Sequence, residues 1–175
     1  MGLSEDEIKS RVYESMDFVG LKKTLDDKSP FDLSGGQKRR VAIASVIAMR
    51  PKVLILDEPC AGLDPKGREV ILSLIKDYQQ KTGSTVIIVS HSMEDVAKLC
   101  SKVVVMNKGK VAMSGTVPEV YSHAQELREI GLNVPQVTEI FLKLKAEGID
   151  CKTDIFTVEQ GTAELKRLFK KEGKA

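Results

Sequence analysis

The sequence predicts an α/β fold built around a parallel sheet. Three short apolar runs, at 53–56, 85–89 and 103–106, have the length and β-branched composition of buried strands in such a sheet. Between them, apolar residues recur three and four positions apart over about 65–81 and 93–100, which predicts helices. The order strand, helix, strand, helix, strand is typical of parallel strands joined by crossover helices.

Helical segments flank this predicted core on both sides. Near the N-terminus, Ser4 and Glu7 have the spacing of a capping box, and Gly20 ends the helix that they open. A polar connector is expected at 21–31. A turn at 107–110 leads to a short fourth strand, after which helical spacing returns at 137–147 and 162–171. We therefore divide the chain into a helical region (1–50), an α/β core (51–115) and a helical C-terminal extension (116–175).

Composition narrows the possible functions. The 175 residues carry a net charge of +2, so bulk electrostatics favours neither nucleic acid nor an anionic membrane as a partner. The three cysteines (Cys60, Cys100 and Cys151) are scattered without metal-ligand spacing, which indicates reduced thiols. No apolar run approaches the roughly 20 residues that a membrane helix needs. We expect a cytoplasmic protein that reaches a membrane only through partners, and we expect no nucleic-acid partner.

The stretch from Leu33 to Gln37 has the features of a phosphate-binding helix start. Ser34 is suited to cap a helix predicted over 36–49, and Gly35 and Gly36 allow backbone N–H groups to approach a ligand closely. The positive end of the helix dipole then faces that ligand, and phosphate is the group that it favours most. The expected buried stripe of the helix is Val41, Ala44, Ile47 and Ala48, and Pro51 ends the helix.

Two carboxylates, Asp57 and Glu58, directly follow the first predicted strand. Open α/β sheets bind ligands at the carboxyl ends of their strands. Phosphoryl transfer to water requires a metal near the phosphates and a group that deprotonates the attacking water. An Asp-Glu pair on its own is usually a solvated turn, and His91 on its own is more often a helix cap than a catalyst.

Taken together, these motifs resemble the ATP-binding-cassette (ABC) ATPases. Leu33–Gln37 is similar to the signature motif of that family, Val53–Glu58 to its Walker B strand and Ala61–Asp64 to its D-loop, while His91 is similar to its switch histidine. The resemblance implies part of a P-loop NTPase (RecA-like) sheet, with part of the ABC helical subdomain at 1–50.

The resemblance also implies roles for these residues, with ATP and Mg²⁺ as cofactors. Asp57 would support Mg²⁺ directly or through water, Glu58 would be the general base, and His91 would sense the γ-phosphate. The signature would contact ATP that a partner subunit holds. Asp64 would cross between subunits as the D-loop aspartate, and it is also suited to cap the next helix. The signature residues so assigned are Ser34, Gly35, Gly36 and Gln37.

One expected motif is absent, because no Gly-x-x-x-x-Gly-Lys-[Ser/Thr] phosphate loop occurs in the 175 residues. The loop supplies backbone donors and a lysine, so most of the phosphate-binding energy within one subunit would be missing. We expect the chain to be either a truncated piece of a longer ATPase or an incomplete gene product, with unpaired strand edges and exposed apolar helix faces where the missing strand would lie. Whether the chain alone is an enzyme is left open.

Segments around the motifs resemble the energy-coupling-factor branch of the family, notably 28–32, 61–68 and 129–138. This implies an ATPase subunit of an importer for a vitamin or a transition-metal ion such as cobalt or nickel. The implied partners are a second ABC ATPase subunit, a transmembrane coupling subunit and a substrate-binding membrane subunit. The alternatives are a non-hydrolysing fragment that contributes its signature to a partner, and an ABC ATPase of another kind.

A basic cluster, Lys38 to Arg40, lies in the first turn of the predicted signature helix, where the helix dipole favours acidic residues. Two interpretations are open: a solvated face, or contact with nucleotide or with acidic residues of a partner. His123 matches no motif and is expected to be a surface residue.

Overall fold

The computed structural model describes residues 2–21 and 28–172, so part of the connector predicted at 21–31 lies outside the described residues. The chain divides into two compact units, Met1–Ser90 and His91–Ala175, which are described separately here. Both combine helices with short strands, which confirms the α/β class. The boundary between the units falls inside the predicted 51–115 segment, and the three-part division stays a prediction.

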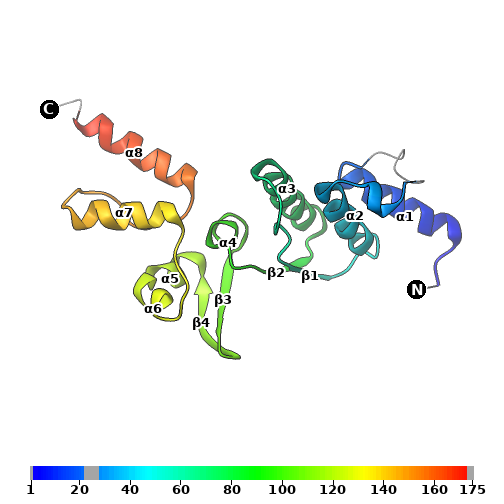
Figure 1. Cartoon of the computed structure of the whole chain (residues 1–175), viewed down its shortest axis with the longest axis horizontal. Helices are drawn as coiled ribbons and strands as arrows, with labels where there is room; N and C mark the ends of the chain where they lie inside the picture. Colours follow the sequence, from blue (N-terminus) through cyan, green and yellow to red (C-terminus); the bar gives the residue numbers. More distant parts are fainter. Residues whose placement is uncertain (1, 22–27, 173–175) are drawn as a thin grey trace. The chain divides into compact units, whose positions relative to one another are not determined.

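In its described residues, 2–21 and 28–90, the first unit contains four helical elements and two strands; Figure 1 shows their arrangement. Helices α1 and α2 begin at the predicted positions, because Ser4 and Ser34 accept hydrogen bonds from backbone N–H groups as N-caps. At α1 only half of the predicted capping box forms, since the Glu7 carboxylate accepts a hydrogen bond from Arg11. The elements are α1 (Glu5–Phe18), η2 (Pro30–Asp32), α2 (Gly35–Ile47), β1 (Val53–Asp57), α3 (Pro65–Thr82) and β2 (Thr85–Val89).

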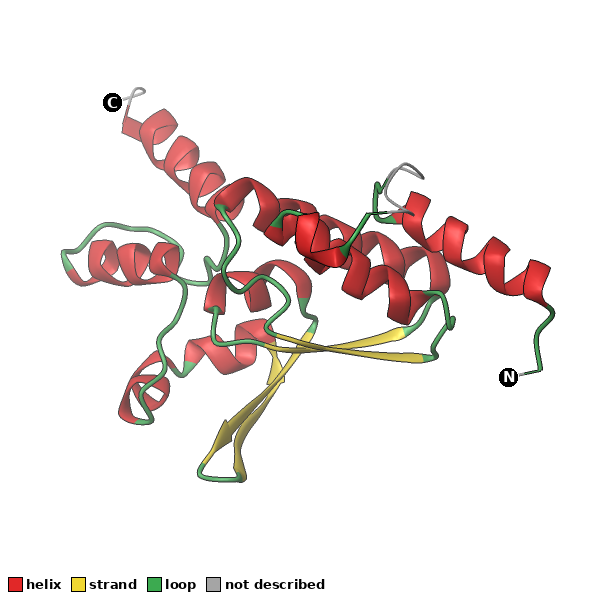
Figure 2. Cartoon of the chain, turned by 45° about the vertical axis from the view of Figure 1, so that its right-hand side comes forward, coloured by secondary structure: helices red, strands yellow, loops and turns green. Residues whose placement is uncertain are grey.

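Strands β1 and β2 pair in parallel, in register from Val53 opposite Thr85 to Asp57 opposite Val89. The helices of this unit lie on one side of the two strands (Figures 1 and 2). Leu54 is accordingly 1% exposed, whereas its neighbour Ile55 is 64% exposed. The prediction that β1 is buried throughout is therefore wrong, because only one of its faces is covered. Val53, Ile87 and Val89 are also exposed, so apolar residues of both strands lie at the surface, which the sequence did not predict.

Helix α2 packs on α1, and its contacts differ in part from the predicted buried stripe. Ala44 and Ile47 are buried as expected, but Ile43 is buried while Val41 is 37% exposed. Val41 instead lines an open groove between α1 and α2, so the apolar pattern alone assigned it wrongly to the core. The other buried residues of this unit include Ile71, Leu72, Ile75 and Tyr78 of α3.

Over residues 91–172, the second unit contains an antiparallel hairpin and five helices. Strands β3 (Lys102–Asn107) and β4 (Lys110–Thr116) pair with each other in the hairpin. The predicted hairpin turn is confirmed, because Lys108 and Gly109 both adopt the positive φ that such two-residue turns require. The helices are α4 (Met93–Leu99), α5 (Val117–Ser122), α6 (Ala124–Glu129), α7 (Gln136–Ala146) and α8 (Val158–Glu172).

Two apolar clusters stabilise the second unit. The larger one gathers Tyr121 and Phe156, whose ring centroids are 5.7 Å apart, and the Tyr121 hydroxyl donates to the Met93 carbonyl at 3.0 Å. The smaller cluster packs Phe141 of α7 against Cys151 and Ile155 of the loop before α8, with Leu168 of α8 beside them. Helix α8 approaches α7 closely at Gly161, where an added Cβ would lie 2.6 Å from a Val137 methyl carbon. The predicted C-terminal amphipathic helix is thus confirmed, with a longer range.

A carboxylate fixes the loop between α7 and α8. The Glu164 side chain is 4% exposed and accepts hydrogen bonds from the Arg167 guanidinium at 2.6 Å and from the Lys152 backbone N–H at 2.9 Å. The bond from Arg167, followed by the bond from Lys152, lowers the pKa of Glu164 to about 2. Both donors favour the ionised carboxylate, so folding stabilises that form.

We therefore predict that Glu164 contributes acid-sensitive stability. Because its folded pKa is lowered, the contribution is fully present above the unfolded pKa near 4.5 and is lost as the pH falls toward about 2. In urea unfolding, Glu164→Gln should be less stable than the parent chain at pH 7, and this difference should shrink below pH 4.5. Glu129→Gln, at an exposed carboxylate of the same unit, is the control. A difference that does not change with pH would contradict the prediction.

Candidate functional site

The signature segment forms the start of helix α2 as predicted. The Gln37 N–H donates to Ser34 Oγ at 3.2 Å, and the Ser34 N–H donates to Gln37 Oε1 at 2.9 Å, which completes a reciprocal capping box. An added Cβ at Gly35 or Gly36 would meet no atom within 4 Å. These glycines are therefore not required by packing within the chain, and they leave the first backbone N–H groups of the helix open to an approaching group.

The two carboxylates stand at the carboxyl end of β1. Asp57 is exposed and lies opposite Val89 in the strand register. Glu58 is partly buried, and its N–H donates to the Val89 carbonyl at 2.9 Å. Its φ of 44° lies in the left-handed region, which side chains other than glycine rarely adopt. Strain of this kind costs on the order of 1–3 kcal/mol and concentrates at functional sites.

The chain leaves Glu58 through two tight turns and enters helix α3. The Ala61 N–H donates to the Glu58 carbonyl at 3.1 Å, and Gly62 has a φ of 71°. Asp64 caps α3 by accepting from the Gly67 N–H at 3.2 Å, so its predicted capping role is confirmed. An added Cβ at Gly67 would lie 2.7 Å from that carboxylate oxygen, so the glycine makes room for the cap.

The structure assigns the predicted site residues to two units. The first unit contains the signature residues, the two carboxylates and the D-loop aspartate: Ser34, Gly35, Gly36, Gln37, Asp57, Glu58 and Asp64. His91 is the first residue of the second unit, where it is exposed and precedes Ser92, the N-cap of α4. His123 is exposed and lies 2.7 Å from a Glu126 carboxylate oxygen, which agrees with its expected place at the surface.

The basic cluster has a role that the sequence did not reveal. The Arg40 guanidinium donates to the carbonyls of Val19 and Gly20 at 3.2 and 3.0 Å, so it caps the C-terminal end of α1. Arg39 donates to the Ala61 carbonyl at 3.4 Å, and Lys38 is exposed. Of the three basic residues, only Lys38 therefore fits the interpretation of a solvated face. Arginine near the end of a helix is a known capping pattern, but α1 and Arg40 are distant in sequence, so no local signal links them.

A metal role for Asp57 fits the chemistry of magnesium. The described residues contain no group of three or more His, Cys, Asp or Glu side chains that could hold a metal. Mg²⁺ keeps several waters and is usually held by one or two carboxylates together with the phosphates of its substrate. A single exposed carboxylate at the strand end agrees with such a site, in which the nucleotide supplies the other ligands.

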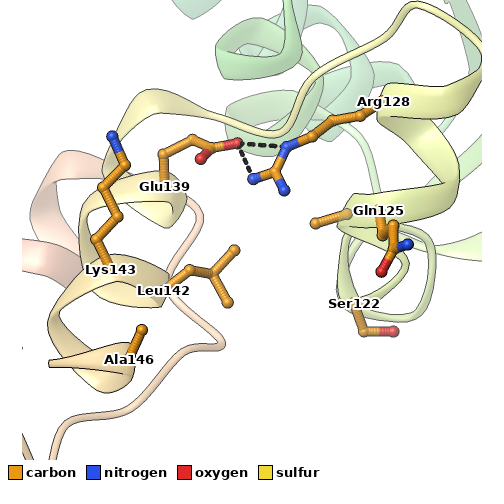
Figure 3. A pocket seen from close by; sticks show the side chains of 8 residues that line it. Ser122, Gln125, Arg128, Glu139, Leu142, Lys143 and Ala146 are labelled. Carbon is orange, nitrogen blue, oxygen red and sulfur yellow. Dashed lines mark hydrogen bonds and ion pairs between the residues drawn. The ribbon is translucent and has the colours of Figure 1, made fainter. Parts of the chain in front are cut away.

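Hollows in the described part of each unit are lined largely by residues outside these motifs. In the first unit, a groove of about 610 Å³ runs between α1 and α2, with Ile8, Val12 and Val41 among its apolar lining and Lys9 and Lys28 at its polar positions. In the second unit, an open hollow of about 500 Å³ lies between α5–α6 and α7. Figure 3 shows Arg128 and Glu139 pointing toward each other across it, joined by hydrogen bonds that include one of 3.2 Å. Arg128 and Glu139 therefore neutralise each other's charge within this hollow.

Comparison with known proteins agrees with the motifs. The family model described as "ABC transporter" matches residues 2–61. An energy-coupling factor transporter ATP-binding protein EcfA2 from Caldanaerobacter subterraneus is 52% identical over 97% of this chain and 59% of its own length. The EcfA2 proteins of Clostridium perfringens and Clostridioides difficile are each 54% identical, over 97% and 99% of this chain and 60% and 61% of their own lengths.

Solved structures agree with the fold. The cbiO1 protein of Clostridium perfringens, part of the ABC transporter complex cbiONQ, has a TM-score of 0.64 and 41% identity over 85% of this chain and 55% of its own. The dimeric ABC transporter cassette MJ0796 has a TM-score of 0.58 and 29% identity over 67% of this chain and 50% of its own. The chain therefore belongs to the ABC ATPase family. Within the family it is similar to the ATP-binding proteins of energy-coupling factor transporters, and it spans about 60% of the length of the curated relatives that it matches.

We predict that the Asp64 cap contributes measurable stability to the site. Asp64→Ala should reduce the free energy of unfolding by about 1 kcal/mol, because it removes the acceptor for the Gly67 N–H. Asp64→Asn should retain most of that stability, since asparagine caps about as well as aspartate. Asp77→Ala, an exposed position on the same helix, is the control in the same urea titration. If Asp64→Ala and Asp64→Asn reduced the free energy of unfolding equally, the stabilisation would come from the charge of Asp64 and not from capping.

Proposed function

We propose that this chain acts within an ATP-hydrolysing ABC ATPase that powers an energy-coupling-factor importer for a vitamin or a transition-metal ion such as cobalt or nickel. The observation that carries the proposal is that one unit contains both a capped signature helix with open glycines and a strand that is followed directly by the strained Glu58. The high identity to ATP-binding proteins of energy-coupling factor transporters supports the branch.

The chain's own residues supply distinct parts of ATP hydrolysis. Glu58 accepts the proton of the attacking water, and the hydrogen bond from its backbone to Val89 holds it at the strand end. Asp57 would hold Mg²⁺, which neutralises charge on the phosphates when it is bound with ATP. His91 would donate a hydrogen bond to the γ-phosphate. The first N–H groups of α2 would face the phosphates of ATP held by a second ATPase subunit.

A second function follows from the missing phosphate loop. Taken as the 175 residues alone, the chain has no Gly-rich loop with lysine to hold ATP beside Asp57 and Glu58. It would then be a non-hydrolysing module that completes a nucleotide site on a partner ATPase. The two functions differ in where Glu58 matters, because Glu58 contributes to catalysis only in a subunit that also contains a phosphate loop.

The groove between α1 and α2 is our proposed site for the membrane partner. Its lining is mainly apolar, and its two lysines, Lys9 and Lys28, favour an acidic residue on the occupant. An amphipathic helix of a transmembrane coupling subunit has this chemistry. None of the chain's described helices is long and apolar enough to cross a membrane. We propose that the protein is held at the inner face of the cell membrane by this partner, together with a substrate-binding membrane subunit.

A complementation assay tests the nucleotide function. The chain is mixed with a full-length ATPase of the same branch whose own signature serine is replaced by arginine. If the chain supplies its signature, ATP turnover should recover, and Ser34→Arg in the chain should abolish the recovery because the side chain blocks the helix start. Ser73→Arg, on an exposed position of α3, is the matched control. Turnover that stays absent with the unmodified chain would contradict the proposed pairing.

A binding assay tests the groove. Val41→Glu places a charge in the apolar lining at a position that is already 37% exposed, so folding should be largely preserved while binding to the coupling subunit weakens at least tenfold. Val70→Glu, at the similarly exposed (41%) residue of α3, is the control. Pull-down with the purified membrane complex measures the effect. Equal binding by both variants would place the membrane partner elsewhere.

A further inference from the structure

Arg39 connects the signature helix to the segment that follows Glu58. Its guanidinium reaches from the first half of α2 and donates to the Ala61 carbonyl at 3.4 Å, across 22 positions of sequence. Ala61 lies between the strained Glu58 and the Asp64 cap, in the D-loop segment 61–64. The bond therefore joins two elements that the proposed function assigns to the same nucleotide site.

Besides the bond from Arg39, the segment is held at its two ends and by backbone hydrogen bonds within its turns, from the Ala61 N–H to the Glu58 carbonyl and from the Leu63 N–H to the Cys60 carbonyl. Before it, the Glu58 N–H is held by Val89, and after it, Asp64 caps α3. In its middle, Gly62 has a positive φ, and an added Cβ there would meet no atom within 4 Å. Short turns with exposed backbone and few packed side chains belong to the low-stability parts of a fold. A hydrogen bond to the Ala61 carbonyl is therefore well placed to limit movement of the segment.

The neighbouring residue, Arg40, attaches α2 at a second point. Arg40, the next residue along α2, donates to the carbonyls of Val19 and Gly20 at the end of α1. Helix α2 is thus tied to α1 by one arginine and to the D-loop segment by the other. A small rotation or shift of α2 would therefore be transmitted to Ala61 through Arg39.

We propose that Arg39 is a positioning residue that couples the start of the signature helix to the D-loop segment, so that both are presented together to nucleotide on a partner subunit. The coupling itself is a property of this chain, whereas its effect on turnover rests on the proposed function. Arg39 does not touch the reacting atoms in this scheme. It acts through the Ala61 carbonyl.

Hydrogen exchange on the chain alone tests the coupling without nucleotide or partner. Arg39→Gln should speed exchange at the Ala61 and Leu63 amides, which donate within the turns, by about threefold to tenfold, as expected for loss of one net hydrogen bond. Amides within α3 should not change. Arg39→Lys should restore part of the protection, and Lys38→Gln, at the exposed neighbour, should match the parent chain. Unchanged exchange in Arg39→Gln would overturn the coupling.

The complementation assay then tests the consequence. We expect Arg39→Gln to lower kcat of the mixed ATPase about threefold to tenfold with little change in the KM for ATP, because the Ala61 contact affects positioning more than ground-state binding. Faster exchange with unaltered kcat would overturn the catalytic part of the proposal. Absence of turnover with the unmodified chain would instead contradict the proposed function, and the exchange result would still stand.

Discussion

The parallel pairing of β1 with β2 determines where the candidate catalytic carboxylates lie. Because Asp57 is opposite Val89, both strands end at the same level, and the Val89 carbonyl is free to accept the Glu58 N–H at 2.9 Å. That bond holds Glu58 in a backbone conformation with a φ of 44°. The backbone conformation of Glu58 sets the direction in which the chain leaves the strand. That direction determines where the following turns lie, and hence where α3 starts at Asp64. A change in strand register would displace all of these groups together.

Helix α2 is the second fixed element, and its attachment is polar as well as apolar. Ile43, Ala44 and Ile47 are buried, while Arg39 donates to a carbonyl of the D-loop segment and Arg40 to carbonyls at the end of α1. Backbone carbonyls that end a helix or line a turn have few partners inside the chain, so a long side chain that reaches them satisfies an acceptor and joins two elements at once.

Local features were predictable from the sequence, and contacts between distant segments were not. Ser34 and Asp64 cap their helices as expected, and the 107–110 turn forms, because capping and turn chemistry depend on residues a few positions apart. The positive φ of Glu58 and the carbonyl contacts of the two arginines depend on neighbours 20 or more positions away. Val41 was assigned to the core because its spacing is helical, but spacing does not reveal which side of a helix is covered.

The uncovered face of β1 and β2 bears on the choice between the two proposed functions. Strands of parallel sheets are normally covered on both faces, yet Ile55 and Val89 are more than half exposed. Covering such surface stabilises a fold by about 25 cal/mol per Å². A polypeptide segment that covered this face would lie directly beside the strand ends where Asp57 and Glu58 stand. Apolar cover for the sheet and phosphate donors for the carboxylates could thus come from one segment, in which case hydrolysis at Glu58 and full stability of the first unit would be gained together.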